Sequence, residues 1–211
     1  MTRRATVIGL VLAGMVALTV GLILGEWLFS RRAAPSLDIA GIYLPDAQPL
    51  EAFNLVHHSG RPFTRADFQG KWTFLYFGYT YCPDVCPLTL AELNRLQKRL
   101  AEQGADRDTA YVLVSVDPQR DTPERLREYV TYFNPKFQGV TGPTEELRRL
   151  TQPLHVFYQR GPDTKGSNYT IDHSSTIALI DPSGRPRAIF TPPQNPERMA
   201  TDFLKIRAAV P

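Results

Sequence analysis

The chemistry of this sequence centres on its two cysteines, Cys82 and Cys86, which lie four positions apart. A thiolate is both a nucleophile and a metal ligand, so a close pair indicates thiol–disulfide chemistry or metal binding. Two cysteines are too few for a scaffold of several disulfides. The usual dithiol oxidoreductase carries Cys-x-x-Cys. The Cys-x-x-x-Cys spacing found here sets the sulfurs one helical turn apart, which suits two ligands of one ion, and a disulfide remains the alternative.

A metal held by this pair needs further ligands, and the chain offers four histidines. Two thiolates favour Cu(I) or Zn(II). A structural zinc site normally has four Cys or His ligands, and the chain has no further cysteine and no second pair at zinc-finger spacing. Copper accepts fewer ligands, so the donor set favours copper. The candidates for the third ligand are His57, His58, His155 and His173.

His173 is the histidine expected to complete the site. It precedes a predicted strand at residues 176–180, and in a thioredoxin-like fold the loop before this strand faces the cysteine loop. Asp172 is expected to orient the imidazole, as carboxylates beside ligand histidines often do. The other histidines are assigned no ligand role: His57 and His58 are expected to be solvent-exposed hairpin residues, and His155 to pack at the start of a strand.

The cysteines lie between a predicted buried strand and a predicted helix. Residues 72–77 are an unbroken apolar and aromatic run, whose length and β-rich content indicate a central strand. Residues 87–103 have helical periodicity, with a leucine stripe from Leu90 to Leu100. A thiol at the start of such a helix meets free N–H groups and the positive end of the helix dipole. Its pKa is therefore expected to be lowered.

The rest of the chain alternates strands and helices, which indicates an α/β fold with a central sheet and helices on both faces. One helix start is marked by Thr122 as N-cap and Pro123 in the first position. A hairpin is predicted between residues 158 and 169. The other predicted strands are 52–58, 111–116, 155–159, 176–180 and 187–190, and the other predicted helices are 123–133, 144–150 and 196–208, with a helical turn at 64–70.

The amino-terminal segment has the composition of a membrane anchor. Residues 5–25 contain no charged side chain, and this length is close to the ~20 residues that cross a bilayer core. Two arginines before the run also fit a signal peptide, but the run is longer than a signal h-region. We therefore expect residues 1–29 to form one transmembrane helix, residues 30–50 a proline-containing linker, and residues 51–211 the soluble domain.

The charge distribution excludes one class of partner. The net charge is +3, from 24 Lys and Arg against 21 Asp and Glu, and the two signs are mixed along the chain. There is no basic stripe interleaved with aromatic residues of the kind that follows a phosphate backbone. We therefore expect no nucleic-acid partner.

Five short motifs in this order resemble the Sco/SenC family of copper-binding, thioredoxin-like proteins. The resemblance extends over residues 53–206 and a single amino-terminal anchor fits it. Each motif alone is weak, and their order makes the set specific. The motifs are FGYT at 77–80, CPDVCP at 82–87, VDP at 116–118, RDTP at 120–123 and DHS at 172–174.

The resemblance implies a thioredoxin-like domain that binds Cu(I) or Cu(II) through the thiolates of Cys82 and Cys86 and the imidazole of His173. It implies a metallochaperone, rather than a turnover enzyme, that helps to build the binuclear copper centre of cytochrome c oxidase. The expected partners are the copper-accepting subunit, other copper carriers and thiol oxidoreductases. The expected location is a bacterial inner membrane, with the domain in the periplasm.

A second function remains open. The same two thiols, as a redox-active disulfide, would make the protein a thiol–disulfide oxidoreductase that keeps the acceptor's cysteines reduced. His173 separates the two hypotheses, because the metal site requires it and the redox reaction does not.

Overall fold

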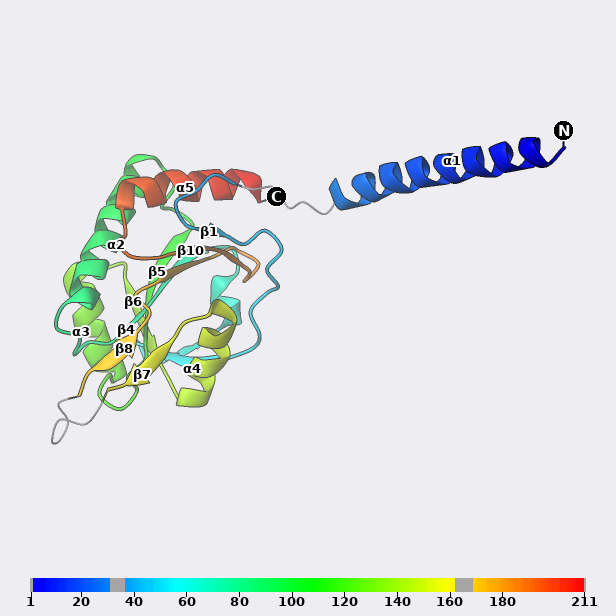
Figure 1. Ribbon diagram of the computed structural model, residues 1–211. Coiled ribbons are helices and arrows are strands. Elements are labelled where there is room, and N and C mark those ends of the chain that lie inside the picture. Colours follow the sequence, from blue (N-terminus) through cyan, green and yellow to red (C-terminus); the bar gives the residue numbers. More distant parts are fainter. Residues whose placement is uncertain (1, 31–36, 162–168, 211) are drawn as a thin grey trace. The chain divides into compact units, whose positions relative to one another are not determined.

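The computed structural model describes residues 2–30, 37–161 and 169–210 (Figure 1). The chain divides into two compact units, Met1–Ser36 and Leu37–Pro211. In the first unit, helix α1 spans Thr2–Ser30. Over the described residues, no helix combines the length and hydropathy needed to cross a membrane. The structure therefore shows a helix over residues 2–29 of the predicted anchor and does not show the membrane-spanning character expected of it.

The second unit begins before residue 51, where the sequence placed the start of the domain. Strand β1, Ile42–Tyr43, pairs with β10, Pro186–Phe190, at one edge of the sheet. Leu50 is only 2% exposed and belongs to the hydrophobic core. Part of the predicted linker is thus packed chain, while its residues 31–36 lie outside the described ranges.

A mixed sheet forms the centre of the second unit. Among the described residues its strand order is β1-β10-β9-β4-β5-β6-β2-β3. The middle strands β4, β5 and β6 are parallel, and β9 runs antiparallel to β4. Parallel neighbours require crossover connections, and helices provide them here. The strands are β2 Asn54–His57, β3 Pro62–Thr64, β4 Trp72–Gly78, β5 Thr109–Ser115, β6 Gln138–Thr141 and β9 Ile177–Ile180.

Strand β4 is buried along its whole length, as its continuous apolar run predicted. Phe74 stacks on Tyr111 of β5, with ring centroids 5.6 Å apart, and Phe203 packs 5.5 Å from Phe74. Large rings thus fill the space between the sheet and the helices on this face. The strand that leads into the cysteine loop is therefore anchored in the core.

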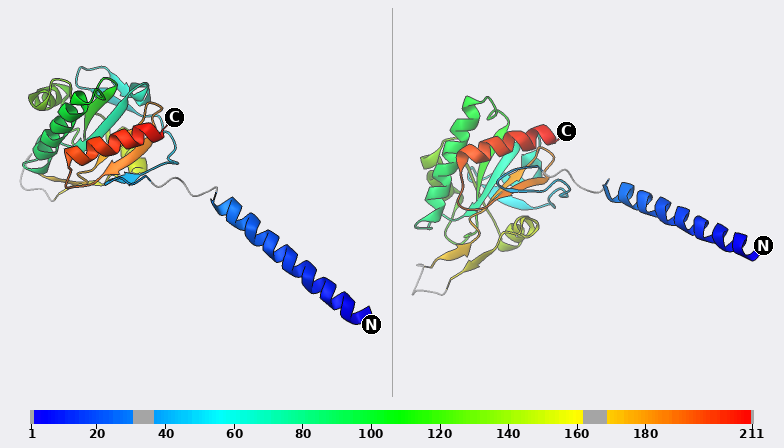
Figure 2. Two further views of the ribbon diagram at one scale, coloured as in Figure 1. Left: turned by 90° about the horizontal axis from the view of Figure 1, so that it is seen from above. Right: turned by 45° about the horizontal axis from the view of Figure 1, so that its top comes forward.

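Helices lie on both faces of the sheet, which confirms the predicted layers. Figures 1 and 2 show α2 and α3 on one side of the sheet and α4 on the other. The Thr122 side chain caps α3 by accepting from the Arg125 N–H at 3.2 Å, as the sequence predicted. The helices are α2 Val85–Glu102, α3 Pro123–Phe133, α4 Thr144–Thr151 and α5 Pro196–Ala209, and a 3-10 turn, η1, spans Arg65–Phe68.

The segment after α4 differs from the predicted strand at residues 155–159. A second 3-10 turn, η2, spans Gln152–Leu154, and His155 follows it in the left-handed conformation with φ 52°. A strand cannot pass through that conformation, so strand β7 begins only at Tyr158 and ends at Arg160. It pairs antiparallel with β8, Ile171–His173, which confirms a hairpin here, while residues 162–168 of its tip lie outside the described ranges.

Candidate metal centre

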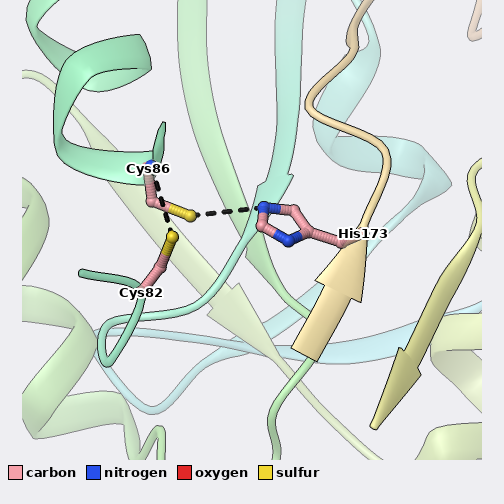
Figure 3. Close-up of side chains that lie close together, drawn as sticks. All are labelled: Cys82, Cys86 and His173. Carbon is pink, nitrogen blue, oxygen red and sulfur yellow. Dashed lines mark hydrogen bonds between the residues drawn. The ribbon is translucent and has the colours of Figure 1, made fainter. Parts of the chain in front are cut away.

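Two sulfurs and one imidazole nitrogen converge beyond the end of β4. Cys82 lies in the loop after β4, Cys86 in the first turn of α2, and His173 is the last residue of β8. The Cys86 Sγ lies 3.3 Å from His173 Nε2, and all three ligand atoms lie within 4.8 Å of one another. Figure 3 shows the imidazole directed at the two sulfurs. Within the described ranges, no other group of three or more His, Cys, Asp or Glu side chains comes as close together.

A glycine at the end of β4 makes room for the Cys86 sulfur. A Cβ on Gly78 would lie 2.7 Å from the Cys86 Sγ and 3.1 Å from a ring carbon of Tyr76. Its carbonyl accepts from the Val116 N–H at 2.9 Å, so the backbone of this position is fixed to the neighbouring strand. The small residue therefore lets a sulfur lie directly against the sheet edge.

The Cys82 sulfur takes the place of a side-chain cap at the start of α2. The N-cap residue Asp84 makes no side-chain capping bond, whereas the Cys86 N–H donates to the Cys82 Sγ at 3.4 Å. A hydrogen bond from the Cys86 thiol, with the backbone N–H groups of Asp84 and Cys86 and the nearby His173, lowers the pKa of Cys82 to about 5, against the opposing effect of burial. Cys82 is thus a thiolate at neutral pH, as its place before a helix predicted.

Cys86 has the opposite character. Its hydrogen bond to the Cys82 sulfur and its burial raise the pKa of the Cys86 thiol far above the ordinary value. Cys86 is 0% exposed, whereas Cys82 is 8% exposed. The Cys86 thiol lies between two acceptors, the Cys82 sulfur and Nε2 of His173. The two sulfurs are therefore a thiolate, Cys82, and a thiol, Cys86, which donates a hydrogen bond to it.

The imidazole is oriented by a backbone carbonyl. His173 Nδ1 lies 3.1 Å from the Ile171 carbonyl oxygen, which can only accept, so Nδ1 carries the proton. In the neutral ring this leaves the Nε2 lone pair facing Cys86. The ring also packs edge-on against Tyr79, with centroids 5.5 Å apart.

Asp172 does not have the orienting role that the sequence suggested. It is exposed on β8, between the buried Ile171 and the half-buried His173. Neighbouring side chains in a strand point to opposite faces, so its carboxylate is directed away from the face that carries His173. The second partner of the imidazole is Ile171, whose carbonyl makes the bond expected of the carboxylate.

The other three histidines lie outside the cluster. His57 was expected to be exposed but is 7% exposed, and burial, with the neighbouring His58 and Arg61, lowers its pKa to about 4. His58 Nδ1 accepts from the Gly139 N–H at 3.2 Å, so it joins β2 to β6. His155, expected to pack, is exposed at the end of η2.

Sequence reasoning missed the polar residues that surround the site. Asp117 and Arg120 form a buried ion pair, and Asp117 also accepts from the Tyr169 hydroxyl at 2.6 Å. Asp121 is buried and accepts from the Thr80 backbone N–H at 2.9 Å. Burial raises its pKa. The signal in the sequence is the pair of motifs at 116–118 and 120–123, which predicted only a helix start and the family resemblance.

The residues present fit a soft metal ion. Two sulfurs and one imidazole nitrogen form a donor set that suits Cu(I), Cu(II) or Zn(II). Three ligands are one fewer than a closed structural zinc site uses. The buried Tyr76 hydroxyl lies near the Cys86 sulfur. The same two sulfurs could also close into a disulfide after the loop relaxes.

Comparison with known proteins gives one consistent family. Residues 44–208 match the family model described as SCO1/SenC. The chain is 32% identical over 209 residues to the SCO2-like protein of Rickettsia felis, which covers 97% of this chain and 99% of that protein. It is 37% identical over 132 residues to the human protein SCO2 homolog, mitochondrial, covering 63% of this chain and 50% of the human one. The chain spans about half the length of the mammalian SCO2 relatives that it matches.

Solved structures agree with the fold. The crystal structure of Arabidopsis thaliana ScoI with copper bound superposes with a TM-score of 0.71 at 31% sequence identity, covering 77% of this chain and 99% of that one. The thioredoxin-like sheet with its flanking helices, predicted from the sequence, is therefore confirmed. The copper ion belongs to the Arabidopsis thaliana structure.

Proposed function

The chain belongs to the SCO1/SenC family, and on that premise we propose that it binds one copper ion through Cys82, Cys86 and His173. The observation that carries the proposal is the convergence of these three soft ligand atoms within 4.8 Å of one another. They come from a loop, a helix and a strand of a well-packed domain, so folding alone brings them together. The copper-bound neighbour supports the choice of metal.

We further propose that the protein is a metallochaperone for the binuclear copper centre of cytochrome c oxidase, with the copper-accepting subunit as its recipient. Copper is the cargo in this role. Three protein ligands leave the ion open to a fourth donor from a partner, which is the first requirement of ligand exchange. The half-buried His173 and the Cys82 sulfur are the ligands that a partner reaches first, because Cys86 is fully buried.

The location and the other partners remain part of the proposal. The family resemblance supports the periplasmic side of a bacterial inner membrane, with contacts to other copper carriers or to thiol oxidoreductases. Protease treatment of intact spheroplasts tests the location. Digestion of the second unit without lysis supports it, and protection until lysis contradicts it.

The second candidate function is thiol–disulfide exchange with the copper acceptor. The observation that favours it is the lowered pKa of Cys82, about 5, beside a second thiol. A thiolate attacks a partner disulfide, and the neighbouring thiol then resolves the mixed disulfide. Copper and a disulfide are mutually exclusive states of these sulfurs, so both functions can belong to one protein at different times.

An anaerobic copper titration of the reduced full-length chain tests the main proposal. We expect the parent to take up one equivalent, and His173→Ala to lose most of that affinity, about 100-fold or more. His155→Ala is the matched control, because this exposed histidine lies outside the cluster. Equal binding by all three proteins would exclude the three-ligand site. No binding, together with rapid exchange with a partner disulfide, would establish the oxidoreductase instead.

A further inference from the structure

Five alternating arginine and tyrosine side chains join the cysteine loop to the hairpin that carries His173. We call them the arginine–tyrosine ladder. The guanidinium carbon of Arg160 lies 3.8 Å from the Tyr169 ring centroid, and that of Arg120 lies 3.6 Å from the same centroid. Arg120 also lies 4.7 Å from the Tyr81 centroid, and Arg125 lies 4.9 Å from it. All four distances are within the range of cation–π interaction.

Arg120 is the member of the ladder that contacts both the cysteine loop, at Tyr81, and the hairpin, at Tyr169. Its side chain is only 10% exposed and forms an ion pair with Asp117. Its Nη1 donates to the backbone carbonyl of Tyr169 at 3.0 Å. The Tyr169 hydroxyl in turn donates to Asp117 at 2.6 Å. Both the backbone and the side chain of Tyr169 are therefore tied to the loop that follows β5.

Three further contacts involve the two residues that connect Tyr169 to the site, Ile171 and His173. Two residues along, the Ile171 N–H donates to the Tyr79 hydroxyl at 3.1 Å, and Tyr79 belongs to the cysteine loop. The carbonyl of Ile171 holds Nδ1 of His173, and Nε2 then lies 3.3 Å from Cys86. Each of these three contacts is short and directional.

We propose that Arg120 is a positioning residue for His173. By holding Tyr169 against Asp117, it sets the position of β8 over the cysteine loop and so the distance between the imidazole and Cys86. Strand β8 pairs only with β7 among the described residues, and β7 with β8 forms a sheet separate from the main one. The main sheet therefore does not fix the strand that carries the third ligand. The Arg120 and Tyr79 contacts add directional restraint to the packing of the buried Tyr169 and Ile171 and to the Arg160–Gln119 bond.

The first test measures copper affinity in a double-mutant cycle and rests on the proposed function. Arg120→Lys keeps a positive charge beside the buried Asp117 but loses the planar fork that stacks and donates in two directions. We expect affinity to fall about ten-fold in the parent and less than two-fold in the His173→Ala background, since positioning acts only through the histidine. Arg125→Lys is the matched control, because Arg125 stacks on Tyr81 and donates to Thr80, both in the cysteine loop, and it should change affinity less than two-fold.

An equal loss in both backgrounds would show that Arg120 acts on the fold or on the cysteines, and would overturn the proposal. No loss in either background would do the same. If the parent's binding does not depend on His173, the proposed function fails, and the second test alone decides the role of Arg120.

The second test uses the metal-free, full-length protein and measures amide hydrogen exchange. We expect Arg120→Lys to speed exchange at Ile171, relative to the core of β5, and Arg125→Lys to leave it unchanged. Tyr169→Phe removes the hydroxyl that donates to Asp117 and leaves the acceptor of the Ile171 amide in place, so it tests the same attachment of the hairpin if Arg120→Lys does not fold. Exchange at the parent's rate in the folded variants would overturn the proposal.

Discussion

At the scale of single residues, Gly78 shows how closely the site is fitted to the sheet. A methyl group there would lie 2.7 Å from the Cys86 sulfur, which must then move. We expect Gly78→Ala to cost about 1–3 kcal/mol of unfolding free energy, as overpacked core positions do, and to weaken copper binding about ten-fold or more. Urea denaturation and the copper titration measure the two effects.

Gly139→Ala is the control for this substitution. Its Cβ would lie 2.9 Å from Leu126, in a contact between β6 and α3 away from the cysteines. We expect a similar loss of stability with copper affinity unchanged. If both variants lose copper equally, the effect comes from general destabilisation and the special role of Gly78 is wrong.

The three members of the cluster could be predicted from the sequence because their chemistry is rare in this chain. Only two cysteines occur, and His173 precedes a strand that the thioredoxin-like pattern places opposite them. The orienting role predicted for Asp172 was wrong because β8 had not been predicted as a strand. In a strand, neighbouring side chains point to opposite faces, so Asp172 points away from the face of His173. The burial of His57 escaped prediction because it depends on β6, which also carried no clear pattern.

At the scale of elements, helix α3 is the clearest case of local control. Thr122 accepts from the Arg125 N–H at 3.2 Å, and Pro123 occupies the first turn. We expect Thr122→Ala to cost about 1 kcal/mol of unfolding free energy, because one N–H loses its acceptor. Thr122→Ser keeps the oxygen and should stay within a few tenths of the parent in urea denaturation. Equal losses would assign the effect to the threonine methyl group.

Elements with their own start signals were predicted closely, and short elements were not. Helix α3 begins and ends where the sequence placed it, at Pro123–Phe133. Helix α2 begins two residues before the predicted Pro87, because the Cys82 sulfur accepts from the Cys86 N–H and extends the first turn. Strands β1, β3 and β8 have two or three residues, which is too few for a periodicity to show.

At the scale of the whole molecule, the buried His57 links stability to pH. Its pKa is about 4 in the folded protein, against 6.5 for the free side chain, mainly because burial disfavours the charged ring. Between these values the unfolded chain binds more protons, so stability falls as the pH falls from about 6.5 toward 4.

We expect the parent to lose on the order of 1 kcal/mol more than His57→Gln across this range, after allowance for partial contact with water. Urea denaturation at several pH values measures the difference, and His155→Gln, at an exposed position, should follow the parent. Parallel pH profiles for parent and His57→Gln would contradict the assignment.

The overall architecture could be predicted because alternating strands and helices leave few ways to bury their apolar faces. The placement of the β7–β8 hairpin could not. It depends on long-range polar contacts such as Arg120 with Tyr169, 49 positions apart, which no local pattern encodes. The start of the second unit was also set too late, because the segment around Ile42 gains its structure only by pairing with β10.

The bond from the Cys86 N–H to the Cys82 sulfur makes the first turn of α2 a reporter of what that sulfur is doing. A sulfur drawn into a metal bond or a disulfide is a poorer acceptor for that amide. The start of a long helix therefore changes with the chemical state of the site. Under the proposed function, a recipient that contacts this turn would bind the copper-loaded and the copper-free protein differently before any ligand is exchanged.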